Sequence, residues 1–296
     1  MKNQQIPERA DMTVVKPIIE VEQLCHIYDS GTPFARKALD DINLAVSPGE
    51  FIGIIGHTGS GKSTLIQHFN GLLKPASGRV LLDGADINGD KSKLKSVRQR
   101  VGLVFQYPEH QLFEENIYKD VAFGPNNMGL TRQEADIRVR EALQLVGIPE
   151  DLYNKSPFEL SGGQKRRAAI AGVLAMKPDV LILDEPTAGL DPAGRDAILS
   201  QIAAMHKIVG NAVILVSHNM EDVSKLSDRI LVMAEGRVIL TGTPKEVFAE
   251  PDKLTTVGLM APPISVLMDK LRKENMPVPD GVFTVEAAAD ALAALL

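Results

Sequence analysis

Residues 51–65 read FIGIIGHTGSGKSTL, and this stretch decides the fold class of the chain. Its first part, Phe51–Ile55, is apolar or small without interruption, which is typical of a buried strand. A glycine-rich loop follows, and a helix is expected to open at about Lys62. A strand, a glycine loop and a helix in this order predict an α/β protein with a mainly parallel sheet.

The loop fits the pattern G-x-x-x-x-G-K-[ST], a phosphate cradle. Its glycines allow the backbone to curl around an anion, and its N–H groups then face the phosphates. Lys62 is expected to reach the β- and γ-phosphates, and the Ser63 hydroxyl to ligate Mg²⁺. A chance match in a turn is the alternative, but the flanking strand and helix argue against it. The residues expected around the nucleotide are Gly56, His57, Thr58, Gly59, Ser60, Gly61, Lys62, Ser63 and Thr64.

Composition and charge narrow the class of protein. The chain has 296 residues, of which 44% are hydrophobic, enough for a sizeable core. Its net charge of −6 gives no general attraction to nucleic-acid phosphates, so we expect no DNA or RNA partner. The single cysteine, Cys25, excludes an intrachain disulfide and fits a reducing compartment. Without a signal peptide or a run of ~20 apolar residues, we expect a cytoplasmic chain that reaches membranes through partners.

The chain divides into a leader, a core with an insertion, and a tail. Residues 1–17 are polar and unpatterned and are expected to be flexible. Residues 18–248 alternate strands and helices, starting with antiparallel strands over 18–45. Helical periodicity over about 107–176 predicts an inserted helical subdomain. Residues 249–296 hold short, proline-broken helices and form a C-terminal extension.

Start and stop signals predict several helix boundaries. A T-x-x-E capping box opens a helix over about 131–146. The helix after the phosphate loop is expected over about 62–73, before a proline. An apolar helix is expected over 165–176 and a last one over about 284–296.

Polar positions follow several apolar strands directly: the phosphate loop, Gln106, Asp184 with Glu185, and His218. In an open parallel sheet, ligands bind outside the carboxyl ends of the strands. We therefore expect these groups to form one site. Taken singly, an Asp-Glu pair before proline could be a strand cap, and a lone histidine is more often structural.

Each group suits a different task. Asp184 is expected to hold Mg²⁺ across from Ser63. Adjacent side chains on a strand point to opposite faces, so Glu185 is expected to polarise the attacking water instead. Gln106 is expected to sense Mg²⁺ and that water, and His218 to bond the γ-phosphate.

A second possible anion-binding site lies in the sequence LSGGQ, residues 160–164. Ser161, Gly162, Gly163 and Gln164 stand at the mouth of a helix, where backbone N–H groups can bind phosphate. A glycine-rich helix cap is the alternative. Because only one of the two phosphate-binding loops carries a lysine, the LSGGQ helix start could bind a nucleotide that is held by another subunit.

The order of these motifs resembles that of ABC-transporter nucleotide-binding domains. GHTGSGKST is similar to their Walker A motif, VLILDE to Walker B and LSGGQ to the signature. Gln106, residues 189–191 and His218 resemble the Q-loop, D-loop and switch histidine. The resemblance implies a P-loop NTPase core and a head-to-tail dimer enclosing two ATP molecules. It also implies that Tyr28 stacks on adenine, a core aromatic being the alternative.

A finer resemblance is to energy-coupling factor transporter ATPases, of the second of two paralogous types. It rests on GHTGSGKSTLIQHFNGLLKP and on residues 106–125, QYPEHQLFEENIYKDVAFGP. It implies ATP hydrolysis with Mg²⁺ at the cytoplasmic face of the cell membrane, powering the uptake of vitamins or trace nutrients. The implied partners are a paralogous ATPase or a second copy, a transmembrane coupling protein and a substrate-binding membrane component. The coupling protein is expected to dock on Tyr107, Glu109, His110, Gln111 and Phe113, and the C-terminal extension to add to the dimer contact.

Two departures from this pattern, Lys165 and Tyr107, lie outside the catalytic set. One rival is a soluble ABC-type ATPase of translation or DNA repair, which usually carries two cassettes or a coiled-coil insertion. Another is a nucleotide-gated module without catalysis, against which Glu185 and His218 argue. The transported nutrient stays open because the ATPase does not touch it.

Overall fold

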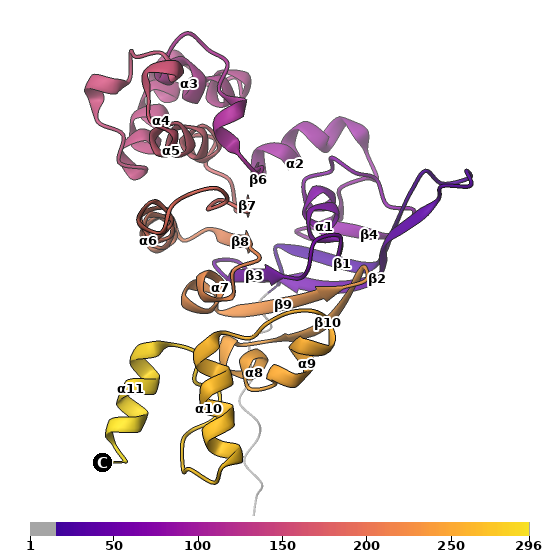
Figure 1. The fold of residues 1–296 in the computed structure, drawn as a ribbon. Coiled ribbons are helices and arrows are strands. Elements are labelled where there is room, and N and C mark those ends of the chain that lie inside the picture. The colour runs from indigo at the N-terminus through magenta and orange to yellow at the C-terminus, as the bar shows by residue number, and fades with distance from the viewer. Residues whose placement is uncertain (1–15, 296) are drawn as a thin grey trace, which may run out of the picture.

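The computed structural model describes residues 16–295 and has a six-stranded sheet at its centre, in the order β10-β9-β3-β8-β7-β6 (Figure 1). β9, β3, β8, β7 and β6 are parallel, and β10 pairs antiparallel with β9. The predicted α/β class with a mainly parallel sheet is therefore confirmed. The strands are β3 (Phe51–Ile55), β6 (Val101–Val104), β7 (Val180–Asp184), β8 (Ala212–Val216), β9 (Arg229–Ala234) and β10 (Arg237–Gly242).

A second sheet is antiparallel, in the order β2-β1-β4-β5. It contains β1 (Ile19–Tyr28), β2 (Arg36–Val46), β4 (Ser77–Leu82) and β5 (Ala85–Asp86). The β1–β2 hairpin, expected from the alternating pattern of residues 18–45, projects well beyond the sheet (Figure 1). Tyr28 lies opposite Arg36 in the last pair of the hairpin before its turn.

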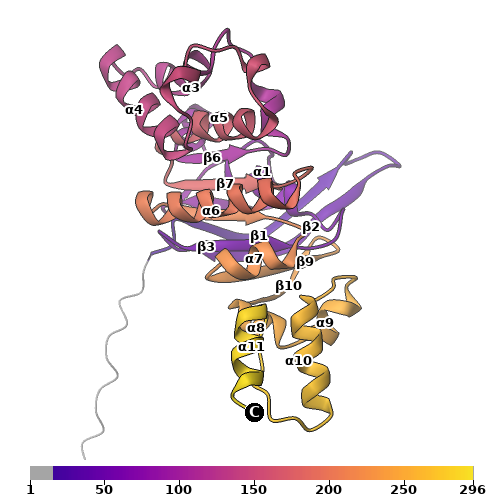
Figure 2. The same ribbon diagram turned by 60° about the vertical axis from the view of Figure 1, so that its left-hand side comes forward.

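The helices form three groups (Figures 1 and 2). Around the sheets lie α1 (Lys62–Phe69), α2 (Leu94–Arg100), α6 (Pro192–Val209) and α7 (Met220–Leu226). One end of the molecule holds α3 (Ile117–Asn127), α4 (Arg132–Leu145) and α5 (Gly162–Leu174). The other end holds α8 (Pro244–Phe248), α9 (Pro251–Thr256), α10 (Pro263–Lys273) and α11 (Val285–Ala293). Short 3₁₀ helices cover Lys91–Lys93, Pro108–Gln111, Glu150–Leu152 and Pro157–Glu159.

Both faces of the parallel sheet are buried. Along β3, Phe51 and Ile55 belong to one apolar cluster and Ile52 and Ile54 to another. This alternation follows from the two-residue period of a strand, and double burial explains why the strand is continuously apolar. The first cluster continues into α3, α4 and α5, so the helical group packs on the sheet as one core.

Two helices differ in their boundaries from the sequence prediction. α1 ends at Phe69 rather than near residue 73, because Gly71 adopts φ +66° and the N–H of Leu72 turns back to the carbonyl oxygen of Gln67 at 3.0 Å, which closes the helix end. α5 begins at Gly162, not at Lys165, because a capping box satisfies its first turn despite the glycines. That helix also ends two residues earlier than expected.

The capping box at Thr131 and Glu134 is confirmed. The final helix is present as α11, while residue 296 lies outside the described residues. Most of the expected leader, residues 1–15, also lies outside them. Cys25 is half-buried, and its sulfur accepts the N–H of Asp41.

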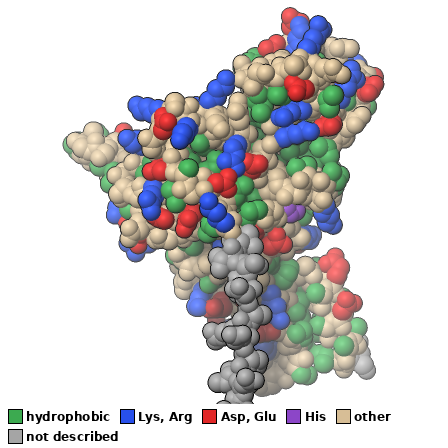
Figure 3. All heavy atoms as spheres, turned by 180° about the vertical axis from the view of Figure 1, so that it is seen from behind, with side chains coloured by type: hydrophobic (Ala, Val, Ile, Leu, Met, Phe, Trp, Pro, Cys, Tyr) green, Lys and Arg blue, Asp and Glu red, His purple; other side chains and the backbone are tan. Residues whose placement is uncertain are grey.

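Seen from behind, basic and acidic side chains are mixed over the sheet and the helical group (Figure 3). Within residues 16–295, no helix has the length and apolar character to cross a membrane.

Candidate active site

One cavity of about 550 Å³ opens at the carboxyl edge of the parallel sheet. It is bounded by the phosphate loop after β3, by the ends of β6, β7 and β8, and by the part of the β1–β2 hairpin next to its turn. The structure thus brings together groups that are far apart in the sequence. The lining residues are Tyr28, Arg36, Ala38, Thr58, Gly59, Gly61, Lys62, Ser63, Thr64, Gln106, Asp184, Glu185 and His218.

The phosphate loop requires glycine at two of its positions. Gly61 has φ +104°, and a Cβ there would lie 2.7 Å from the carbonyl oxygen of Ala38. A Cβ on Gly56 would collide with the carbonyl oxygen of Met233. The loop is therefore wedged between neighbouring backbone segments, which fixes its curl.

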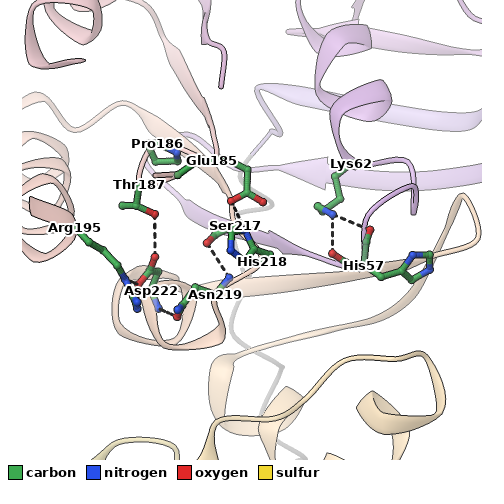
Figure 4. A network of polar contacts seen from close by, with 12 residues as sticks. His57, Lys62, Glu185, Pro186, Thr187, Arg195, Ser217, His218, Asn219 and Asp222 are labelled. Atoms are coloured by element: carbon green, nitrogen blue, oxygen red, sulfur yellow. Dashed lines mark hydrogen bonds and ion pairs between the residues drawn. The ribbon is translucent and has the colours of Figure 1, made fainter. Parts of the chain in front are cut away.

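The amine of Lys62 points back over the loop that carries it (Figure 4). It donates to the carbonyl oxygens of Gly56 at 2.6 Å and His57 at 3.0 Å. Burial lowers the pKa of Lys62, while the carboxylates of Glu185 and Asp184 oppose that shift. A cation held in this way fits the role of neutralising phosphates cradled by the same loop.

Asp184 and Glu185 line the same cavity, so the expectation that they point to opposite faces is wrong. β7 ends at Asp184, and Glu185 adopts φ +50°, which turns its side chain out of the strand's alternation. Burial raises the pKa of Asp184, a hydrogen bond from Ser63 opposes this, and the charge of Glu185 adds to the rise. The neighbouring negative charge of Glu185 therefore adds to the cost of ionising Asp184.

The Ser63 hydroxyl and the Asp184 carboxylate are hard oxygen ligands that line the same cavity. Between residues 16 and 295 no cluster of three or more His, Cys, Asp or Glu side chains could hold a metal. Mg²⁺ usually binds one or two carboxylates together with substrate phosphates. The donor set therefore fits Mg²⁺ that is shared with a nucleotide.

Glu185 is paired with His218, whose Nδ1 lies 2.7 Å from Oε2 (Figure 4). The Glu185 side chain is 14% exposed and the His218 side chain 73% exposed. The backbone N–H of Glu185 donates to the carbonyl oxygen of Val216 at 2.9 Å, which ties the ends of β7 and β8 together. A half-buried carboxylate held by an imidazole at the cavity wall can orient a water and accept its proton.

A buried network behind this pair was not predicted. Asp222, only 1% exposed, accepts from Arg195 Nε at 2.7 Å and from the Thr187 hydroxyl at 3.3 Å (Figure 4). Thr187 lies two residues after Glu185, and Asp222 lies on α7, which begins two residues after His218. The network therefore braces the segments that carry both members of the pair. Asp222 lies on a short polar helix, where the sequence pattern does not distinguish a buried carboxylate from an exposed one.

Comparison with known proteins identifies the family. A model described as ABC transporter matches residues 39–188. The energy-coupling factor transporter ATP-binding protein EcfA2 of Caldanaerobacter subterraneus subsp. tengcongensis is 56% identical over 272 residues, covering 92% of this chain and 95% of that protein. EcfA2 of Clostridium tetani is 57% identical over 271 residues, covering 91% and 94%.

The chain belongs to the ABC transporter family, among the energy-coupling factor transporter ATPases of the second type. Solved structures agree. Clostridium perfringens cbiO1, described as part of the ABC transporter complex cbiONQ, has a TM-score of 0.74 at 47% identity, covering 86% of this chain and 99% of that one. The cassette MJ0796, a dimer bound to ADP and Pi, has a TM-score of 0.67 at 29% identity, covering 76% and 98%. As an ABC ATPase, the chain binds ATP and couples its hydrolysis to transport.

The ABC signature, LSGGQ, lies apart from this cavity. Ser161 caps α5 in a capping box with Gln164. A Cβ on Gly162 or Gly163 would meet nothing within 4 Å, so the start of the helix is open. Ser161, Gly163 and Gln164 line a separate cavity of about 310 Å³, and no residue from 160 to 164 lines the cavity at the sheet edge.

The Q-loop segment contains an ion pair that the sequence did not reveal. Arg166, 2% exposed, donates to both oxygens of Glu109 at 3.0 and 2.7 Å. Its remaining donor bonds the carbonyl oxygens of Pro186 at 3.0 Å and Ala188 at 2.9 Å. Glu109 is therefore committed to an internal contact that joins the Q-loop, α5 and the loop after β7.

The other docking candidates are more open. Tyr107 is 41% exposed and adopts φ +55°, and its ring stacks near His110 at 5.9 Å. Phe113 is 65% exposed and packs edge-on against Phe123. A groove of about 710 Å³ runs between α2, α3 and α5, and its wall includes Gln111 and Phe113.

Arg36 also lines the cavity at the sheet edge, which the sequence analysis did not predict. It is the cross-strand partner of Tyr28, and its Nη2 lies 3.4 Å from the place a Cβ on Gly59 would take. A lone arginine on an exposed strand matches no motif, so only the pairing of β1 with β2 reveals it.

Proposed function

We propose that this chain is the ATP-hydrolysing subunit of an energy-coupling factor importer, which powers the uptake of vitamins or trace nutrients. The observation that carries the proposal is the convergence of Lys62, Asp184 and the Glu185–His218 pair on one cavity. Such a site has the parts for phosphoryl transfer to water: a phosphate cradle, hard oxygen ligands and a base. The relatives named energy-coupling factor ATP-binding proteins support the kind of transporter.

Each site residue then has a role. Lys62 and the loop N–H groups neutralise the β- and γ-phosphates. Ser63, Asp184 and, through its amide, Gln106 would hold Mg²⁺, which offsets the charge that develops on the phosphates. Glu185 orients the attacking water and accepts its proton, and His218 holds that carboxylate beside the γ-phosphate.

The residues around the nucleotide complete the site. The loop residues from Gly56 to Thr64 surround the phosphates, and Tyr28 stacks on the adenine. In this proposal residues 18–248 are the nucleotide-binding domain, with the helical subdomain at about 107–176. Residues 249–296 are an extension that adds to the dimer contact.

A second subunit supplies the signature. Ser161, Gly162, Gly163 and Gln164 stand at an open helix start outside the chain's own nucleotide cavity, which supports binding of a partner's ATP. ATP then binds the closed dimer better than the open one, and hydrolysis removes that preference. The partner is a paralogous ATPase or a second copy. Exposed apolar side chains on the extension, Met260 (84%) and Val285 (61%), support its part in the contact.

The groove beside the Q-loop suits a helix of a transmembrane coupling protein, which would also hold a substrate-binding membrane component. Its apolar wall includes Leu94, Phe113, Phe123 and Met176, with Lys91, Lys95 and Arg98 along one side. An amphipathic helix docks in such a groove through its apolar face. The chain would then lie on the cytoplasmic face of the membrane as a peripheral subunit.

Co-purification tests this proposal. The tagged chain, expressed in its native host and extracted in mild detergent, should bring down an integral membrane protein and a second ATPase. Phe113→Asp should lose the membrane protein and keep ATP binding, whereas the exposed Phe34→Asp, outside the groove, should keep both. Recovery with ribosomes or DNA-repair proteins and no membrane protein would overturn the transport assignment.

A further inference from the structure

Two histidine rings stand behind Tyr28, the side chain proposed to carry the adenine. His26 lies two residues earlier on β1, and its ring meets that of Tyr28 edge-on, with centroids 4.5 Å apart and an angle of 78°. The ring of His68, on α1, meets His26 in the same way at 4.8 Å and 73°. Edge-to-face pairs at these distances are favourable, so the three rings support one another.

Both ends of this series of rings return to one residue of the phosphate-loop helix. The Tyr28 hydroxyl lies 3.2 Å from the Thr64 hydroxyl. His68 Nδ1 lies 2.7 Å from the Thr64 carbonyl oxygen, to which it donates. A closed circuit therefore runs from Thr64 through Tyr28, His26 and His68 back to Thr64, two residues after Lys62.

Burial increases along the series away from the cavity. Tyr28 is 39% exposed, His26 is 9% exposed and His68 is fully buried. Burial lowers the pKa of His68 to about 4, so this ring is uncharged at neutral pH, and its bond to Thr64 holds it in place. His26 Nδ1 lies 3.3 Å from the carbonyl oxygen of Lys74, which anchors the middle ring from the other side. The ring of Tyr28 contacts His26 on one side, and its exposed part lines the cavity.

We propose that His26, backed by His68, is a positioning residue that fixes the Tyr28 ring as the adenine platform and thereby sets the affinity for ATP. This inference rests on the proposed adenine-stacking role of Tyr28. His26 does not line the nucleotide cavity, so it acts only through Tyr28. A platform held in place before binding loses less side-chain freedom when the base arrives.

The test compares His26→Leu, which fills the space without a ring, with His26→Phe, which keeps the ring. Both variants lose the contact with Lys74, so the pair isolates the ring. Binding of ATP and of inorganic tripolyphosphate to the full chain is measured by calorimetry. We expect His26→Leu to weaken ATP roughly three- to tenfold, His26→Phe to stay near wild type, and tripolyphosphate affinity to be unchanged in both. In the assembled transporter, the KM for ATP should rise by the same factor at constant kcat.

Two results would overturn the inference: unchanged ATP affinity in His26→Leu, or an equal loss for ATP and tripolyphosphate, which would mean that the phosphate loop itself is damaged. Tyr28→Leu, measured in parallel, separates this inference from the proposal beneath it. If Tyr28→Leu leaves ATP affinity unchanged, the adenine platform itself is wrong. If Tyr28→Leu weakens ATP and His26→Leu does not, only the role of His26 is wrong.

Discussion

Nδ1 of His218 lies 2.7 Å from Oε2 of Glu185, although the two residues are 33 positions apart in the chain. Their strands, β7 and β8, are parallel neighbours that end at the same edge of the sheet. The left-handed turn at Glu185 is what brings its carboxylate to the imidazole. The pair is thus a product of the sheet topology and one backbone conformation.

Removing the charge of Glu185 should separate ATP binding from hydrolysis. Glu185→Gln keeps the shape of the side chain but cannot accept a proton from water, so we expect turnover to fall by roughly 10²–10⁴-fold while ATP affinity stays within a few-fold. A closed dimer should then accumulate with ATP, measurable by size-exclusion chromatography. Glu141→Gln, a change at an exposed carboxylate on α4 outside the cavity, is the control and should hydrolyse normally. Near-normal turnover of Glu185→Gln would contradict the assigned role.

Loss of the Lys62 amine should abolish tight nucleotide binding. In Lys62→Ala the phosphates lose a charge-assisted partner, and we expect ATP affinity to fall at least tenfold, since one such bond contributes about 1.5–3 kcal/mol. Titration with a fluorescent ATP analogue measures this. Lys207→Ala, on the exposed end of α6, is the matched control and should bind normally. Equal affinities for wild type and Lys62→Ala would refute the phosphate-loop assignment.

The network around Asp222 should act on kcat rather than on nucleotide affinity. Asp222→Asn is nearly isosteric but weakens the bonds to Arg195 and Thr187, and we expect the free energy of unfolding to drop by about 1.5–3 kcal/mol. Because the segments carrying Glu185 and His218 are then less well braced, kcat should fall roughly ten- to hundredfold with ATP affinity retained. Urea unfolding and single-turnover assays check both. A variant with lower stability but full kcat would limit the network to a structural role.

Much of the fold could be predicted from local patterns in the sequence. The strands around the site are continuous apolar runs with polar residues at their ends, so the elements could be placed from the sequence, as could their gathering at one edge. The capping box at Thr131 was equally readable, because it lies within four residues. Signals of this kind need no knowledge of distant contacts.

Tertiary contacts explain what the sequence did not reveal. Arg166 and Glu109 are 57 residues apart, and the sequence around either residue does not predict a buried ion pair. Arg36 reaches the cavity only because β1 pairs with β2 in one register. Strand alternation predicted the wrong direction for Glu185, because β7 ends one residue before it and the backbone turns there. These features follow from packing and register rather than from local pattern.

Acid should destabilise the fold partly through His68. Burial lowers the pKa of this ring from 6.5 to about 4, so the unfolded chain binds its proton more readily between these values. The stability that His68 contributes is therefore present above about pH 6.5 and is lost as the pH falls toward 4, by at most roughly 3 kcal/mol. Urea unfolding at pH 7.5, 6.0 and 5.0 should show a weaker pH dependence in His68→Phe, which cannot titrate, than in wild type. His206→Phe, a change at a half-buried histidine outside this circuit, is the control; identical pH slopes for wild type and His68→Phe would rule out this source of acid sensitivity.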